Sequence, residues 1–452
     1  VEAKLNKENG TINEARVSPT ITYRFSKNLS AQVIYQFQRQ LIDQRSLYPA
    51  ESLFARDFVN RFTQVDFATG KPLQKPIPDG GILDQSLARN TAHNGRAQLD
   101  YHFAKNNHEL NVLAGIELRE VTGDQSKFRL YGYQEDLLVS SAVDFNSIYF
   151  TYPNFYFEQI PGAPELVSGN IDRYRSWFFN GAYTYKSKYT LSASARKDAS
   201  NLFGVRSNQK SVPLWSTGIK WSINREKFYN VEWLPFLEAR LTYGYNGNIN
   251  TSLTAFTTAQ ITTNRYNLLS ASIINPPNAD LRWEKTGMLN IGIDFGTRNR
   301  VITGSLEYYS RTGSDLIGSI FTDPTSGVIQ YQGNVAGMKG SGIDVQLQSR
   351  NISGVFNWTT QFLFNYSADK ITKYYVKPTI SELFSQSIAP FEGHPVFSVF
   401  SYQWAGLDHA TGNPLGIVNK TPSSDYSNIV NPSLDDIVYN GPANPQIFGS
   451  LM

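Results

Sequence analysis

The segment ELNVLAGIELR, residues 109–119, decides the fold because its side chains alternate between two kinds. Its even positions are apolar, and most of its odd positions are polar, charged or glycine. Successive residues of a strand point to opposite faces, so the segment predicts a β-strand with one apolar and one polar face. Its length fits the roughly 9–11 residues that a tilted membrane-crossing strand needs.

The same alternation recurs further along the chain. Four more segments have it: Tyr189–Arg196, Leu237–Asn246, Leu289–Gly296 and Ile343–Gln348. We expect one face of these strands to be convex and to meet lipid, with Leu110, Val112, Leu191, Ala193, Leu241, Ile291, Ile293, Val345 and Leu347. The concave face should carry Glu117, Arg240, Asp294 and Asp344. The pattern predicts an all-β chain, an antiparallel meander without long helices.

The links between strand-like segments alternate strictly between short and long. The short links are Ser26–Asn28, Ala104–Asn107, Lys186–Lys188, Thr297–Arg300 and Asn351–Gly354. The long links lie near residues 40–90, 121–173, 249–283, 313–340 and 371–396. In an antiparallel meander all short links fall at one end of the sheet. Short periplasmic turns and long extracellular loops are typical of outer-membrane β-barrels.

Aromatic residues gather beside the short links. They are Phe25, Phe103, Tyr185, Tyr189, Phe295 and Phe356. An aromatic belt at the membrane interface belongs in this position. A soluble β-sandwich also alternates, with its apolar face inward, but it would not sort its loops by length or place aromatics at one end. We therefore favour the membrane barrel and keep the sandwich as the alternative.

Composition excludes several other classes. Charged residues make up 17% of the chain, below the ~25% of an average soluble domain. The net charge of +3 gives no support to nucleic-acid binding. The absence of cysteine excludes disulfides and thiol catalysis. No apolar run approaches the ~20 residues of a membrane helix, and no signal peptide is visible, which an exported protein would have lost.

We predict twelve strands and consider a thirteenth near 397–407. The twelve are 17–25, 29–39, 91–103, 108–120, 175–185, 189–198, 212–223, 236–247, 286–296, 301–312, 341–350 and 355–368. The one long link on the short side, 224–235, is interpreted as an amphipathic turn with Phe228 and Trp233. Apart from the regular succession of strand pairs and links, no short internal repeat is expected.

No constellation of catalytic or metal-binding residues is apparent. The five histidines lack metal-like spacing with carboxylates, and no nucleophile elbow, P-loop or H-E-x-x-H motif occurs. The glycines of 333–342 precede a strand and do not open a helix, which disfavours a phosphate site. Asp435 and Asp436 are interpreted as solvated loop residues, with a calcium site as the less favoured alternative. We therefore predict no cofactor, no metal and no enzymatic activity.

Eight short motifs occur in an order that resembles a known family. They are RKDASNLFG (196–204), WSINREKF (221–228), RLTYGYNGN (240–248), NADLRWEKT (278–286), NIGIDF (290–295), TGSDLI (312–317), GLDHATG (406–412) and NPQIFG (444–449). Ala199, Asn201 and Ala279 depart from the family pattern. Together, from about His93 to Gly449, they resemble the SusC/RagA-type TonB-linked outer-membrane transporters of the Bacteroidetes.

The resemblance implies a 22-stranded outer-membrane barrel with an N-terminal plug and a TonB box. The sequence shows neither plug nor box, so we interpret it as an internal barrel fragment, residues 1–452, with both sheet edges open. The strand near 17–25 should lie at one edge and that near 355–368 or 397–407 at the other.

The implied function is TonB-energised uptake of an oligosaccharide or peptide, with a SusD-like lipoprotein over the extracellular end. The alternatives are a siderophore-type receptor without a lipoprotein lid, and a non-transport surface β protein such as an adhesin.

Three groups of residues are candidates for functional contacts. Asp198, Ser200, Phe203 and Gly204 belong to a family motif that we expect to structure a loop, with Asp198 and Ser200 bonding backbone groups. Glu238, Arg240, Asp294, Asp344 and Gln346 should face the lumen and the plug. The candidates for substrate contact are Tyr149, Tyr152, Tyr156, Tyr331 and Trp404, with contact to a partner or to neighbouring loops as the alternative.

Overall fold

A computed structural model describes residues 5–66, 68–153, 155–162, 166–201, 211–248, 253–263, 268–323, 325, 327–328, 330–376, 378–384 and 390–452. Hydrogen bonds order thirteen strands of one sheet as β1 (Lys7–Val17), β3 (Leu29–Tyr48), β6 (Gly81–Lys105), β7 (His108–Gln134), β11 (Leu166–Tyr185), β12 (Tyr189–Ser200), β13 (Ser211–Ser222), β14 (Phe236–Asn248), β17 (Glu284–Gly296), β18 (Ile302–Phe321), β19 (Gln330–Ile352), β20 (Trp358–Tyr374) and β26 (Ile447–Leu451). Two more strands of this sheet, β2 (Thr20–Arg24) and β8 (Val139–Ser141), pair with β3 and β7.

The remaining elements are short. Small sheets pair β4 (Gln64–Val65) with β5 (Pro72–Gln74), β9 (Ile148–Phe150) with β10 (Phe157–Gln159), β15 (Thr258–Thr263) with β16 (Leu269–Asn275), β21 (Ser398–Tyr402) with β25 (Ile437–Pro442), and β22 (Trp404–Leu407) with β23 (Pro414–Val418) and β24 (Thr421–Ser423). The helices are α2 (Leu53–Phe62), α3 (Ile380–Phe384) and α4 (Tyr426–Ile429), with 3₁₀ turns η1 (Ile223–Arg225), η2 (Arg298–Arg300) and η4 (Leu434–Asp436). No described helix is long and apolar enough to cross a membrane.

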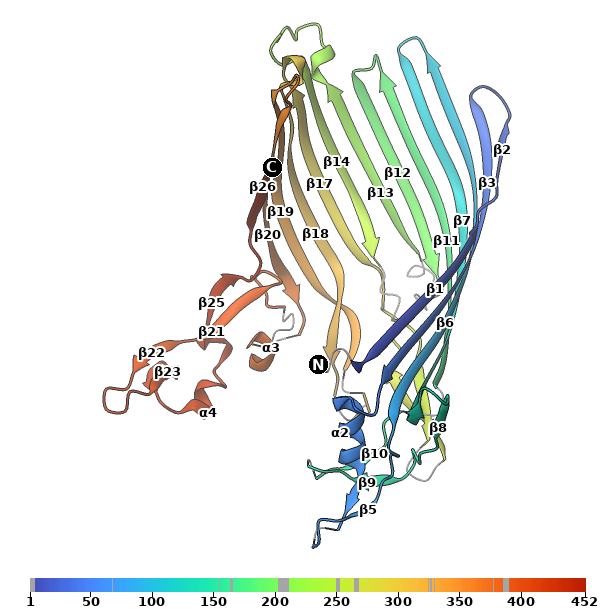
Figure 1. Cartoon of the computed structure of the whole chain (residues 1–452). Coiled ribbons are helices and arrows are strands. Elements are labelled where there is room, and N and C mark those ends of the chain that lie inside the picture. Colours follow the sequence, from blue (N-terminus) through green and yellow to red (C-terminus); the bar gives the residue numbers. More distant parts are fainter. Residues whose placement is uncertain are drawn as a thin grey trace. The chain divides into compact units, whose positions relative to one another are not determined.

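The chain divides into two compact units. The first comprises Val1–Thr22, Gln32–Ala97 and Glu117–Arg175, and the second comprises Tyr23–Ala31, Gln98–Ile116 and Ser176–Met452. In the second unit β12 to β20 run side by side, each antiparallel to the next (Figure 1). The predicted antiparallel meander, nearly all β, is therefore confirmed.

Strand register in the second unit lines up apolar side chains across eight strands. One row of cross-strand neighbours, from β12 to β26, is Leu191, Ile219, Leu241, Ile291, Tyr308, Ile343, Tyr366 and Ile447. Every member of this row is exposed. Because the register is shared, Ile293, Val345 and Leu347 lie on the same face, as predicted.

The exposure of these residues decides between the two architectures considered. The described buried clusters contain none of the apolar row, so no second sheet covers it. In a sandwich these side chains would be the core. The sandwich alternative is therefore wrong, and the apolar face is the one that meets lipid.

The first unit has a buried core of its own, built around α2. Ser52 caps this helix by accepting a hydrogen bond from the Ala55 amide at 3.1 Å. The helix buries one face against the long strands and a neighbouring loop, in a cluster of Ala55, Phe58, Val59, Phe62, Ile77, Ile82, Tyr131 and Ile160. The Tyr131 hydroxyl donates to the Pro161 carbonyl at 2.6 Å, which keeps the polar end of this buried side chain satisfied.

Several sequence-based boundaries were wrong. The strands β3, β6, β7, β11, β18 and β19 run well beyond their predicted ends, into the ranges interpreted as long loops. Residues 398–407 form strands of two small sheets and not a thirteenth strand of the large one. The strand that follows β20 in the large sheet is instead β26.

One of the two predicted edges of the large sheet is confirmed, and the other is not. Both β1 and β2 pair with β3, so the region near residues 17–25 does lie at an edge. The other edge is β26 and not 355–368 or 397–407. No hydrogen-bonded ladder joins β1 to β26 within the described part of the chain.

A cluster around Glu226 fixes the link between β13 and β14. Its carboxylate accepts from Lys188 Nζ at 2.8 Å, from the Tyr189 hydroxyl and from Trp221 Nε1 at 3.1 Å. The side chains of Lys188 and Glu226 are only 18% and 11% exposed. The hydrogen bond from Lys188, followed by those from Tyr189 and Trp221, lowers the pKa of Glu226 to about 2. Glu226 thus joins two neighbouring short links.

Glu226→Gln should lower the melting temperature of the protein at neutral pH. The pKa of Glu226 is depressed in the folded state, so its stabilisation is complete above the ordinary value of 4.5 and is lost as the pH falls towards about 2. The gap between wild type and variant should therefore be constant above about pH 5 and close below it. Glu232→Gln, an exposed acid of the same link, is the control and should melt as wild type. A gap that widens with acid would contradict this role.

A charge on the apolar face should destabilise the protein in lipid far more than one on the polar face. Ile343 and Gln346 lie on opposite faces of β19. Ile343→Arg should cost about 2 kcal/mol or more in a bilayer, because arginine would be moved into hydrocarbon. Gln346→Arg is the matched control and should cost less. The temperature at which heat-modifiable electrophoretic migration is lost measures both, and equal losses would refute the face assignment.

Candidate functional site

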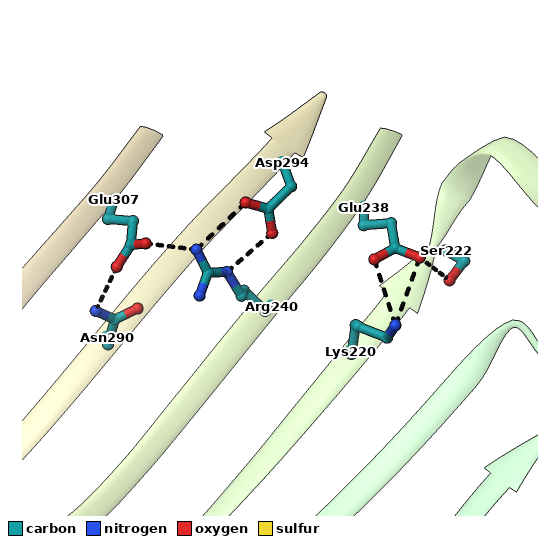
Figure 2. Close-up of polar contacts among 7 residues, drawn as sticks. All are labelled: Lys220, Ser222, Glu238, Arg240, Asn290, Asp294 and Glu307. Carbon is teal, nitrogen blue, oxygen red and sulfur yellow. Dashed lines mark hydrogen bonds and ion pairs between the residues drawn. The ribbon is translucent and has the colours of Figure 1, made fainter. Parts of the chain in front are cut away.

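The polar face of the second unit carries a network of charged side chains. Arg240 on β14 makes an ion pair with Asp294 on β17, Nε to Oδ2 at 3.0 Å, and also pairs with Glu307 on β18 (Figure 2). The second oxygen of Glu307 accepts from Asn290 Nδ2 at 3.1 Å. One arginine therefore joins three consecutive strands.

A second group in the same face centres on Glu238. This carboxylate accepts from the Ser222 hydroxyl at 2.6 Å and pairs with Lys220 Nζ at 3.3 Å (Figure 2). Lys220 and Ser222 lie on β13, beside Glu238 on β14. The two groups together extend the polar face from β13 to β18.

Gly292 makes the reach of Arg240 possible. Register places Gly292 directly between Arg240 on β14 and Glu307 on β18. A Cβ atom added at Gly292 would lie 2.8 Å from Arg240 Nε, closer than such atoms approach. The absence of a side chain thus lets the guanidinium cross β17. The motif NIGIDF (290–295) places Asn290, Gly292 and Asp294 together in this network.

Asp344 continues the row on the next strand. It is the cross-strand neighbour of Glu307, and it makes no ion pair within the described residues. Four carboxylates, of Glu238, Asp294, Glu307 and Asp344, face two basic groups, Lys220 and Arg240. This part of the polar face therefore carries more carboxylates than basic side chains.

The short-turn end of this face is hollowed. A pocket of about 640 Å³ is lined from four strands and their links. Asp294, Ser305 and Gln346 are among the polar residues that line it, and Phe236 and Phe295 are among the apolar ones. Gln346 and Asp294, both predicted to face the lumen, thus line one cavity. Glu238 and Arg240 lie on the same face beside it.

The aromatic candidates divide among several places. Tyr149 is half-buried, with its ring 6.3 Å from that of Phe62, so it helps to hold its loop on the core of the first unit. Tyr152 and Tyr156 are exposed, at 53% and 65%. Tyr331 is half-buried on β19 opposite Ile320, and Trp404 is 67% exposed at the start of β22. Tyr149, Tyr152 and Tyr156 share one loop, and Tyr331 and Trp404 belong to other elements.

The motif at 196–204 is described only in part. Asp198 pairs with Arg196 Nε at 2.7 Å, and Arg196 also donates to the Ser176 hydroxyl at 2.9 Å. Ser200 is the last residue of β12. Phe203 and Gly204 lie outside the described residues. The role of Asp198 and Ser200 in bonding loop backbone remains a prediction.

A second pocket was missed because it lies in ranges interpreted as loops. It measures about 480 Å³ in the first unit and is lined by Gln44, Ser46, Asp84 and Arg129 among others. Arg129 and Asp84 form a two-fold ion pair, with both N–O distances 2.6 Å. The hydrogen bond to Asp84 raises the pKa of Arg129 further. The sequence carried little signal for this pocket, because the alternation of β3 fades after residue 38, where Arg39, Ile42 and Asp43 break it.

A repeated hairpin was also missed, contrary to the expectation of no internal repeat. DFATGKPL (66–73) and DHATGNPL (408–415) share the pattern D-x-A-T-G-x-P-L. The Asp66 and Asp408 carboxylates each accept from the alanine amide two residues on, at 2.9 Å. The threonine hydroxyl of each copy donates to the same carboxylate. These hydrogen bonds lower the pKa of both acids. The two copies form the turns of the β4–β5 and β22–β23 hairpins.

Comparison with known proteins gives consistent matches. A family model described as TonB dependent receptor-like, beta-barrel, matches residues 5–442. TonB-dependent receptor P39 of Formosa agariphila is 27% identical over 274 residues, 57% of this chain and 25% of that protein. TonB-dependent receptor SusC of Bacteroides thetaiotaomicron is 28% identical over 210 residues, 44% of this chain and 21% of that protein.

Solved structures agree in fold. The RagAB peptide transporter structure matches with a TM-score of 0.77 and 21% identity, over 99% of this chain and 46% of the matched chain. The RagAB importer in its open-open state matches with a TM-score of 0.77 and 22% identity. The chain thus spans less than half the length of these relatives.

Gly292→Leu should break the link between Arg240 and Glu307 without removing a charge. The new side chain would occupy the path of the guanidinium, leaving Glu307 beside Asp344 with less compensation. We expect a loss of about 1 kcal/mol, modest because these ion pairs are about one-third exposed. Adding Glu307→Gln should recover part of the loss in a double-mutant cycle of thermal melts. Purely additive effects would show that Gly292 acts only through packing.

Proposed function

The chain belongs to the TonB-dependent receptor family, as part of its outer-membrane β-barrel, and from this we propose that it forms the wall of a nutrient importer. Its homologues are receptors and not enzymes. The observation that carries the proposal is the two-faced sheet, apolar on one side and polar on the other across eight strands. Such a wall separates lipid from a wet lumen.

The cargo in this proposal is an oligosaccharide or a peptide, imported without covalent change. The match to RagAB, which is named a peptide transporter, and to SusC supports this class. In the proposed assembly a SusD-like lipoprotein covers the extracellular end, and TonB energises release into the periplasm.

The charged face is proposed to dock the plug domain of the receptor and not the cargo. The acidic excess of Glu238, Asp294, Glu307 and Asp344 favours a basic surface against it. Asp344, which makes no ion pair within the described residues, is the proposed partner of a basic plug residue. Gln346 and Arg240 would add hydrogen bonds at the same contact.

The exposed aromatics are proposed to contact cargo. Tyr152, Tyr156 and Trp404 expose flat rings that can stack on a sugar or line a peptide cleft. Tyr149 and Tyr331 are half-buried and are proposed as further cargo-contacting residues, each within its own unit. We also propose that the family motif with Asp198, Ser200, Phe203 and Gly204 orders the loop that follows β12.

The test is uptake and binding by the receptor as its host cell makes it, together with its lipoprotein. A deletion strain should lose growth on the cognate glycan or peptide and regain it on complementation. The double variant Tyr152→Ala/Tyr156→Ala should bind cargo about tenfold more weakly by calorimetry. Phe228→Ala, equally exposed but beside a short turn, is the control. Uptake of an iron chelate with no glycan or peptide phenotype would instead indicate a siderophore receptor.

A further inference from the structure

The short links of the second unit carry an unusual concentration of basic residues. We call the six segments 24–28, 104–107, 186–188, 223–235, 297–301 and 350–357 the turn row, which includes the links and the adjoining strand ends with Arg24, Lys105 and Arg350. The six segments contain ten lysines and arginines and two acids. The rest of the chain holds 31 basic and 36 acidic residues, so the positive charge of the protein is localised in the turn row.

The turn row is continuous. Backbone hydrogen bonds tie each link to its neighbouring strand or link: His102 N to Asn28 O at 2.8 Å, Lys186 N to Asn107 O at 2.6 Å, Ser222 N to Lys188 O at 2.8 Å, Arg298 N to Trp233 O at 3.0 Å and Arg350 N to Val301 O at 2.7 Å. The links gather at one end of the strands (top of Figure 1). Its charges therefore lie at one level along the wall.

Nine of the ten bases are exposed and form no ion pair within the described residues, although the charge of Arg225 acts on Glu238 from a greater distance. Lys188 is the exception, since Glu226 neutralises it. The others make no ion pair within the described residues: Arg24, Lys27, Lys105, Lys186, Arg225, Lys227, Arg298, Arg300 and Arg350. Elsewhere, bases such as Arg129, Arg240 and Arg282 each pair with a carboxylate. The turn row therefore presents uncompensated cations to its surroundings.

Exposed aromatic side chains share the same segments. Phe25, Phe228, Trp233 and Phe356 are 58%, 68%, 66% and 66% exposed. Aromatic rings prefer the level between hydrocarbon and headgroups, and lysine and arginine extend their charge from that level towards water. In this family the short turns face the periplasm, so the level is that of the inner leaflet.

We propose that the turn row binds anionic phospholipid headgroups of the periplasmic leaflet. Lipid fits better than a soluble protein partner, because the charges spread along six successive links beside exposed rings and do not form one compact patch. Each lysine or arginine would attract the phosphate of a neighbouring lipid, with a strength that falls as salt is added. The resulting shell of anionic lipid would fix the depth at which the sheet lies in the membrane.

The test measures lipid preference in the receptor as the cell makes it, reconstituted in bilayers. Brominated phosphatidylglycerol and brominated phosphatidylcholine quench tryptophan fluorescence, and Trp221 and Trp233 lie at or next to the turn row. The turn variant is Lys27→Gln/Lys105→Gln/Lys186→Gln. The control is Lys71→Gln/Lys373→Gln/Lys420→Gln, three exposed lysines outside the turn row. Lys186 and Lys420 both have positive φ, of 52° and 65°, so backbone strain is matched.

Wild type and control should prefer phosphatidylglycerol, and the turn variant should lose about tenfold or more of that preference. Raising salt to about 1 M should abolish the wild-type preference, which tests the proposal even if the turn variant fails to fold. An unchanged preference in the turn variant, or none in wild type, would overturn the proposal. Binding of the turn row to peptidoglycan or a soluble TonB domain without lipid preference would overturn it as well.

Discussion

The structure depends on one constraint: in hydrocarbon every backbone N–H and C=O must be hydrogen-bonded within the protein. The antiparallel ladder from β12 to β26 meets it, and it also fixes which side chains share a face. A slip of one residue in any strand would move its apolar residues into the lumen. The unbroken row from Leu191 to Ile447 shows that eight strands keep a common register.

The same register builds the charged face. Because alternate residues point inward, Glu238, Arg240 and Asp294 come together although they lie far apart in sequence. Gly292 then allows one guanidinium to reach a third strand. The antiparallel ladder thus determines three separate features: the face that meets lipid, the polarity of the lumen and the position of the cations in the turn row.

The sequence predicted the faces well because period-two alternation reflects unlike solvents on the two sides. It predicted strand ends poorly, since β3 and β7 continue where α2 and nearby loops pack on them and alternation fades. The alternation within each strand identified Arg240 and Asp294 as lumen-facing. The roles of Glu307 and Gly292 could not be identified in this way, because they depend on the register between strands. Asp344 was expected in the lumen. Its position beside Glu307, however, becomes known only from the pairing of β18 with β19. The basic turn row could not be predicted from the sequence, because it becomes apparent only when the fold brings the six links to one end of the sheet.

Alternate residues of one strand should face lipid and lumen, and site-directed spin labelling measures this most directly. The chain has no cysteine, so single cysteines can be placed at residues 290 to 294 of β17 without background. Spin labels there report access to oxygen, which partitions into lipid, and to a water-soluble nickel chelate. We expect high oxygen access at 291 and 293 and low access at 290, 292 and 294. Uniform access along these five positions, or the inverse alternation, would contradict it.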